Sequence, residues 1–153
     1  MKTIGLGFLL AGLLLGSAAT VRAAGAATAL EGTWKVTAAS EDGKDEAADA
    51  IAGMTMTVTG ADYKIVKGGA QTETGTLTVG KEGAVDTVDF VVVTGEDKGK
   101  TQKGIYKVEA DKAKLAYFED KTPNRPTELA SKAGQTFFAM EKTAAATPSP
   151  AAK

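Results

Sequence analysis

The sequence predicts an all-β domain whose strands form an eight-stranded antiparallel up-and-down barrel, with a short helix or loop after the first strand. Three observations predict this fold class. Apolar and polar residues alternate with a period of two through a series of short segments. These segments follow one another with short, turn-rich connections, which is typical of a meander. A meander of this size loses its two exposed edges when its first strand pairs with its last.

Each strand is predicted by its own alternation pattern. Residues 34–38 open the domain, with Trp34 and Val36 on one face. Residues 54–59 give the cleanest pattern, because Met54, Met56 and Val58 face one way and the threonines between them face the other. The later segments, in chain order, are residues 63–66, 72–79, 84–93, 101–108, 115–118 and 135–141. An open sandwich would use the same strands, and periodicity alone does not separate it from the closed barrel.

Two segments break the β pattern. Residues 41–53 are acidic and rich in alanine, and they fit either a short helix that ends at Gly53 or a solvated loop. Residues 119–134 contain Pro123 and Pro126, which fix the backbone where no ladder hydrogen bond is needed. The prolines favour an ordered loop with a helical turn at residues 127–130.

The two ends of the chain predict export and a tail. Residues 1–23 combine an early lysine, an apolar stretch and a cleavage pattern, so we expect a signal peptide, with a retained membrane anchor as the alternative. Residues 24–29 are then a short flexible segment, and residues 30–142 are the barrel domain. Residues 143–153 have no large apolar residue and predict a disordered Ala/Thr/Pro tail, or a spacer in the cell envelope. We expect a periplasmic or extracellular protein with no stable membrane span after cleavage.

Charge and composition exclude several function classes. The chain has 18 basic and 19 acidic residues, and cleavage removes Lys2 and Arg22, which leaves 16 basic against 19 acidic residues and a net charge of −3. This balance does not indicate the basic surface patch that is typical of nucleic-acid-binding proteins. The chain has no His and no Cys, so the usual general base, the Ser–His and Cys–His pairs and common metal ligands are missing. We expect no catalytic residues, no metal site and no cofactor, and therefore not an enzyme.

Several motifs in order resemble those of a known family. They are Leu30-Glu31-Gly32-Thr33-Trp34-Lys35-Val36, Asp42-Gly43-Lys44, Asp97-Lys98-Gly99-Lys100-Thr101 with Gly104-Ile105-Tyr106, and Arg125-Pro126-Thr127-Glu128 with Gly134-Gln135-Thr136. On these motifs the chain resembles the lipocalin-like (calycin-type) family of conserved hypothetical proteins found mainly in planctomycete bacteria. The resemblance implies an exported β-barrel without established catalytic residues. It also implies that Trp34 plugs the closed end of the barrel, with Arg125 packed across its indole ring.

The expected function is reversible binding of a small hydrophobic molecule at the open end of the barrel. Inward-facing apolar residues are predicted to line the site: Met54, Met56, Val58, Leu77, Phe90, Tyr106 and Tyr117. In one alternative the same residues fill the barrel of a structural or protein-interaction module of the cell envelope, whose protein partner the sequence does not identify. In a second alternative the domain is an enzyme that uses only Asp, Glu, Lys or Tyr.

Overall fold

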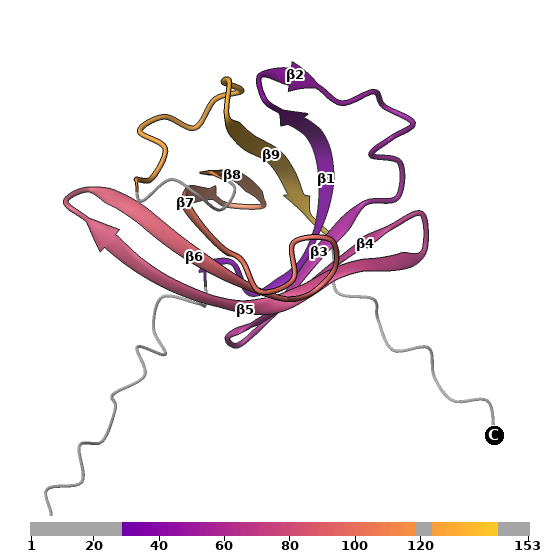
Figure 1. Cartoon of the computed structure of the whole chain (residues 1–153), viewed down its shortest axis with the longest axis horizontal. Coiled ribbons are helices and arrows are strands. Elements are labelled where there is room, and N and C mark those ends of the chain that lie inside the picture. The colour runs from indigo at the N-terminus through magenta and orange to yellow at the C-terminus, as the bar shows by residue number, and fades with distance from the viewer. Residues whose placement is uncertain (1–28, 119–123, 144–153) are drawn as a thin grey trace, which may run out of the picture.

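The fold is a closed antiparallel β-barrel, as a computed structural model shows (Figure 1), and the structure describes residues 29–118 and 124–143. In this part of the chain the strands, in order, are β1 (Gly32–Glu41), β2 (Lys44–Asp45), β3 (Thr55–Thr59), β4 (Asp62–Lys67), β5 (Ala70–Glu82), β6 (Val85–Thr94), β7 (Thr101–Glu109), β8 (Lys112–Phe118) and β9 (Gln135–Lys142). The two-residue strand β2 only extends the end of β1, so the other eight strands build the barrel.

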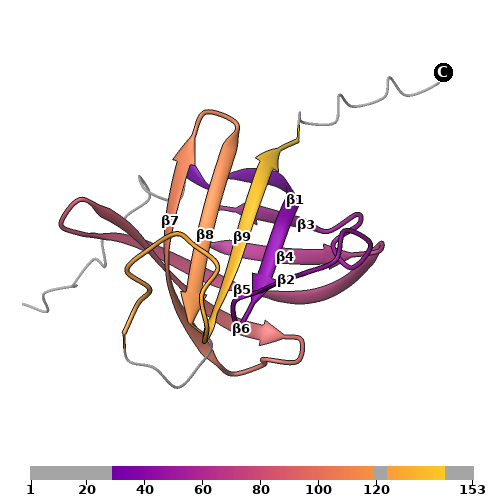
Figure 2. The same ribbon diagram turned by 90° about the horizontal axis from the view of Figure 1, so that it is seen from above.

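The first and last barrel strands close the sheet. Strand β1 pairs with β3 along one edge and with β9 along the other, from Trp34 opposite Lys142 to Glu41 opposite Thr136. A bulge between Val36 and Ala38 bends β1 where the sheet curls over. In Figure 2, β7, β8, β9 and β1 cross in front of β3, β4 and β5. The closed eight-stranded barrel predicted from the sequence is therefore confirmed over the open sandwich.

The predicted strands are present, and several are longer than the alternation pattern indicated. The turn between β5 and β6 was expected at residues 80–83. The structure instead pairs Glu82 with Val85, so only Gly83 and Ala84 make the turn. Lys81 and Asp86 face each other across this extension, with Nζ 2.6 Å from the carboxylate. An opposite-charge pair across two strands stabilises their pairing as an apolar pair would. It does not, however, produce the alternation of apolar and polar residues from which strands are predicted.

The segment after β1 is a loop, and the short helix is not formed. Residues 47–54 make consecutive turns, in which the Ala50 amide donates to the Ala47 carbonyl at 2.9 Å and the Met54 amide donates to the Ile51 carbonyl at 2.9 Å. The Asp49 carboxylate accepts a hydrogen bond from the Ala50 amide at 3.0 Å. Side-chain contacts of this kind compete with helical hydrogen bonds, and they favour the turn that the chain adopts.

The prediction of a helical turn at residues 127–130 is also wrong, because these residues form bends outside any helix. The Gln135 side-chain amide donates to the Ala130 carbonyl and so holds the segment against the start of β9. Lys132 and Glu128 form an exposed ion pair of 2.7 Å along it. Pro123 and the rest of residues 119–123 lie outside the described residues.

One end of the barrel is closed by a packed core around Trp34. The Trp34 side chain is 0% exposed, and its Nε1 donates to the Leu30 carbonyl at 2.7 Å. Val58, Leu115 and Met140 are buried in the same core. Trp34 is therefore part of the buried core, and its role in closing the barrel stays a prediction.

Arg125 does not lie over Trp34, which corrects the expectation drawn from the family resemblance. The cation above the indole ring is Lys142, whose Nζ lies 5.3 Å from the ring centroid. Arg125 instead donates to Asp89 from two nitrogens, at 2.5 and 3.2 Å, and to Glu82 at 2.8 Å. It also donates to the backbone carbonyls of Val88 and Gly104. Two carboxylates and two carbonyls accept more hydrogen bonds from the planar guanidinium group than an aromatic face could. Arg125 therefore ties the loop before β9 to β6 and β7.

The predicted ends of the domain are only partly covered by the structure. Residues 1–28 and 144–153 lie outside the described residues, so the signal peptide and most of the tail stay predictions. Thr143 was assigned to the tail, but its amide and hydroxyl both donate to the Thr33 carbonyl at 2.9 Å. Thr143, the first residue of the predicted tail, is thus hydrogen-bonded to β1. Within the described residues, no helix has the length and apolar character needed to cross a membrane.

Candidate binding cavity

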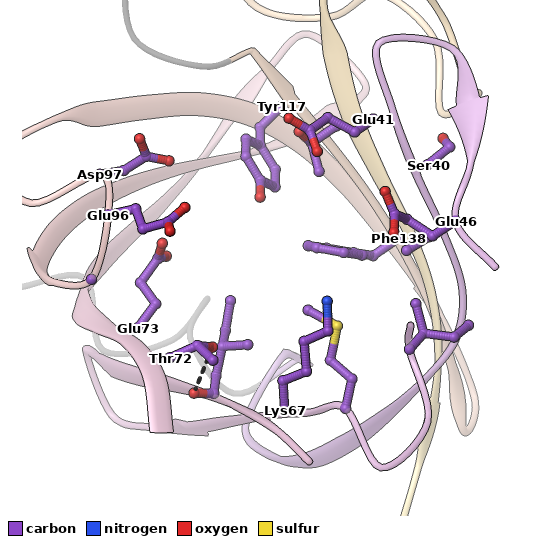
Figure 3. A pocket seen from close by; sticks show the side chains of 16 residues that line it. Ser40, Glu41, Glu46, Lys67, Thr72, Glu73, Glu96, Asp97, Tyr117 and Phe138 are labelled. Atoms are coloured by element: carbon purple, nitrogen blue, oxygen red, sulfur yellow. Dashed lines mark hydrogen bonds between the residues drawn. The ribbon is translucent and has the colours of Figure 1, made fainter. Parts of the chain in front are cut away.

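A cavity of about 670 Å³ opens at the end of the barrel opposite Trp34 (Figure 3). The barrel wall contributes residues from the end of β1, the end of β4, the start of β5, the end of β8 and the start of β9. Two loops complete the rim: the turns after β2 and the β6–β7 loop. The cavity therefore depends on chain segments that only the closed barrel brings together.

The larger apolar and aromatic side chains of the lining are Ile51, Met54, Ile65, Tyr117 and Phe138, and Ala39 adds a small apolar surface. The hydrogen bond between the Met54 amide and the Ile51 carbonyl places the first two at the same turn. The Met54 carbonyl accepts from the Val36 amide at 3.0 Å, which ties that turn to β1. The successive turns after β2 thus carry apolar side chains to the mouth of the barrel.

The rest of the lining is strongly acidic. Among the residues that the structure describes, five carboxylates, those of Glu41, Glu46, Glu73, Glu96 and Asp97, line the cavity together with one ammonium group, that of Lys67, which gives this part of the lining a formal charge of −4. Figure 3 shows Glu73, Glu96 and Asp97 gathered on one side, opposite Phe138. The cavity therefore has an acidic wall, which we define as Glu73, Glu96 and Asp97, facing a side on which Phe138 lies with Glu46 beside it.

Neighbouring side chains hold two members of the acidic wall in place. Asp97 accepts hydrogen bonds from Lys100 Nζ at 2.5 Å and from Nε2 of the buried Gln102 at 3.2 Å. Glu73 accepts a hydrogen bond of 2.7 Å from the Tyr63 hydroxyl. Burial raises the pKa of Tyr63 above its ordinary value, and the hydrogen bond to the Glu73 carboxylate raises it further. Tyr63 therefore stays protonated and keeps donating at neutral pH.

Below the cavity the barrel is filled. The rings of Tyr63, Phe90, Tyr117 and Phe138 pack in a row, with successive centroids 5.0, 5.9 and 6.0 Å apart. The void among these rings measures about 10 Å³, which is at the lower limit for one water molecule. These aromatic side chains form the floor that separates the cavity from the core around Trp34.

The structure divides the predicted ligand-binding residues into three groups. Met54 and Tyr117 line the cavity. Met56 and Phe90 lie beneath it, beside the small void. The other three, Val58, Leu77 and Tyr106, belong to the packed core and line neither space, so their assignment as ligand contacts is wrong. A period of two identifies the residues that face inward, but it does not give their height along the barrel axis.

The acidic lining was not predicted from the sequence, in which residues 41–53 fitted either a short helix or a solvated loop. A signal was present, because Glu96 and Asp97 lie between two glycines in a short connection that must turn over one end of the barrel. Those acids come close to Glu73 because β5 and β6 pair with Thr74 opposite Thr94, a register that the local pattern does not reveal.

The arrangement is suited to binding more than to covalent chemistry. Within residues 29–118 and 124–143, no group of three or more acidic side chains is placed to hold a metal ion. Asp86 and Asp89, both on β6, are engaged separately with Lys81 and Arg125. What the described site offers is apolar surface, aromatic rings and fixed negative charge.

The fold and the cavity together define a class of protein: a closed eight-stranded antiparallel barrel with one packed end and one hollow end. Comparisons of the chain with models of protein families, with curated proteins and with solved structures find no match.

Proposed function

We propose that this domain reversibly binds a small hydrophobic molecule at the open end of its barrel and catalyses no reaction on it. The observation that carries the proposal is the cavity of about 670 Å³ bounded by Met54, Ile65 and Phe138 above a filled aromatic floor. Small-molecule sites usually have volumes of roughly 300–1,000 Å³ and are lined largely by apolar and aromatic side chains. An apolar molecule that enters this cavity leaves water without disturbing the core.

Export is part of the same proposal. The predicted signal peptide, residues 1–23, would carry the domain across the inner membrane, in line with the family resemblance. N-terminal sequencing of the mature protein from the periplasm and the culture medium tests this step. A first residue at Ala24 supports it, whereas a full-length protein retained with the membranes contradicts it.

The binding proposal is tested by titration with N-phenyl-1-naphthylamine, an uncharged dye whose fluorescence rises in apolar surroundings. We expect a saturable rise with one site per chain. Ile51→Trp fills the cavity from its loop and should abolish the rise. Val91→Trp is the matched control, because Val91 lies on β6, is 44% exposed and does not line the cavity. The absence of a saturable signal, or an equal loss in both variants, would refute the proposal.

One observation favours a second candidate function, a protein-interaction module of the cell envelope. Val85, Val91 and Val93 are 43%, 44% and 50% exposed on β6. Large apolar side chains that share the outer face of one strand are typical of a contact surface when they form a patch. Sedimentation of the wild-type protein and of Val91→Lys over a range of concentrations tests this candidate. A concentration-dependent association that Val91→Lys removes, together with no dye binding, would favour it over the ligand-binding function.

A further inference from the structure

We propose that the molecule held in the cavity is an amphipathic organic cation, with an ammonium group at the acidic wall and an apolar body against the opposite side. This inference rests on the proposed ligand-binding function and names the chemical class of the ligand. It follows from how charge, apolar surface and hydrogen bonds are distributed around one cavity.

The charge at this end of the barrel is local to the cavity. The whole chain carries a formal net charge of −1, whereas the cavity lining alone carries −4. Lys100 lies beside Asp97 with Nζ 2.5 Å from Oδ1, and counting it still leaves the mouth with a charge of −3. Like charges gathered at a concave, partly apolar surface produce a focused negative potential, which attracts cations and repels anions.

The acidic wall is organised before any ligand arrives. Tyr63 holds Glu73, and Lys100 and Gln102 hold Asp97, so these two carboxylates have fixed positions. Glu96 lies between them in Figure 3, with its carboxylate directed toward that of Glu73. A carboxylate has about four lone-pair sites, so Glu73 and Asp97 can each accept from a ligand ammonium group while they keep these partners. Such preorganisation lowers the cost of binding.

Aromatic and apolar groups complete the site for a molecule with one charged end. Tyr117 points into the cavity near the acidic wall, and Phe138 extends toward it from the other side (Figure 3). A cation above an aromatic face gains a further attraction, and the ring also covers the carbon chain attached to it. Ile51, Met54 and Ile65 supply the surface against which an alkyl or aryl body would pack.

An organic cation fits better than a metal ion or a fatty acid. In the described part of the chain, the acidic side chains do not gather into a group that could coordinate a metal, whereas a larger ammonium group with several donors can reach separated carboxylates. A fatty acid would suit the apolar surface, but its carboxylate would meet the acidic rim. A ligand therefore matches both the apolar surface and the negative charge of the cavity only if it is an apolar molecule with a cationic group.

The test compares three ligands of equal chain length, octylamine, octan-1-ol and octanoate, by displacement of bound N-phenyl-1-naphthylamine at pH 7.5 and low salt. We expect octylamine to displace the dye at a concentration at least ten times lower than octanol, with octanoate weakest. Two charges about 5 Å apart in a water-like dielectric correspond to roughly fourfold in affinity. Glu96→Gln should therefore weaken octylamine by about fourfold and leave octanol unchanged. In 1 M salt, where the Debye length is about 3 Å, the preference for the amine should shrink.

The control variant is Glu109→Gln, which makes the same change of charge at the β7–β8 hairpin, outside the cavity. It should leave the displacement by all three ligands unaltered. Dye binding without a preference for the amine, or an equal effect of Glu96→Gln on octylamine and octanol, would overturn the inference while the proposed function stands. If neither the dye nor any of the three ligands binds saturably, the proposed function itself fails.

Discussion

Replacing Trp34 by Phe should weaken the barrel strongly without unfolding it. Trp34 is completely buried, and its Nε1 donates to the Leu30 carbonyl at 2.7 Å, so phenylalanine leaves that carbonyl without its partner. An unsatisfied buried polar group costs about 1–3 kcal/mol. The missing ring atoms leave a cavity that adds roughly 1 kcal/mol. We therefore expect a loss of about 2–4 kcal/mol in the free energy of unfolding, against the 5–15 kcal/mol that is typical of a domain.

The assay is urea denaturation followed by far-UV circular dichroism, because Trp34 is the only tryptophan and the variant has no indole emission. The slope of the free energy against urea should be unchanged, since the same surface is exposed on unfolding. Lys142→Met is the comparison variant: it removes the cation above the ring and should cost only about 0.5–1 kcal/mol, the value of an exposed cation–π contact. A loss below 1 kcal/mol for Trp34→Phe, or an equal loss in both variants, would refute Trp34 as the closing plug.

Three further predictions concern single residues. Gly104→Ala should destabilise by about 1–3 kcal/mol in urea denaturation, because its Cβ would lie 2.7 Å from the Ala116 carbonyl oxygen; a neutral effect would contradict this packing. Ser40→Ala should leave the protein equally stable or up to about 1 kcal/mol more stable, since the buried Ser40 hydroxyl has no hydrogen-bond partner among residues 29–118 and 124–143, whereas a clear loss would reveal one. Because folding raises the pKa of Tyr63, the protonated hydroxyl contributes fully to the free energy of unfolding below pH ~10, the pKa of an unfolded tyrosine. Above that pH the contribution declines. In Tyr63→Phe the fall in stability between pH 9 and 11 should be shallower than in the wild type; identical slopes would contradict the shift.

Much of the barrel is predictable because the alternation of apolar and polar residues in each strand identifies the face that points inward. The alternation through Met56 and Val58 requires a half-buried strand, and the structure buries both residues while the threonines between and beside them are more exposed. The same rule failed at residues 80–82, where an ion pair replaces apolar contact across the ladder. Strand ends that are stabilised by ion pairs are therefore not predicted from the alternation of apolar and polar residues.

The position of Arg125 shows a different limit. A single arginine near the last strand was expected over the indole ring, but two acidic side chains and two backbone carbonyls on neighbouring strands provide a better match for its donors. Asp89 and Glu82 lie about forty residues away along the chain, and the successive pairing of β5, β6, β7 and β8 brings them to Arg125. Lys142 takes the place above Trp34 because β9 ends opposite that residue.

The candidate site was only half predictable for the same reason. Met54 and Tyr117 follow from the inward pattern, but the acidic wall combines β5 with the β6–β7 loop and appears only when the strands are in register. The depth of the cavity was also beyond the sequence, because it depends on how far the rings of Phe90 and Phe138 fill the barrel.

The most direct measurement is a two-dimensional NMR titration of the isotopically labelled domain with N-phenyl-1-naphthylamine. We expect the amide resonances of Ile51, Glu96 and Phe138 to shift together with one dissociation constant, while the indole resonance of Trp34 stays in place. Shifts centred on Trp34, shifts confined to the outer face of β6, or no saturable shift at all would contradict a ligand site at the open end of the barrel.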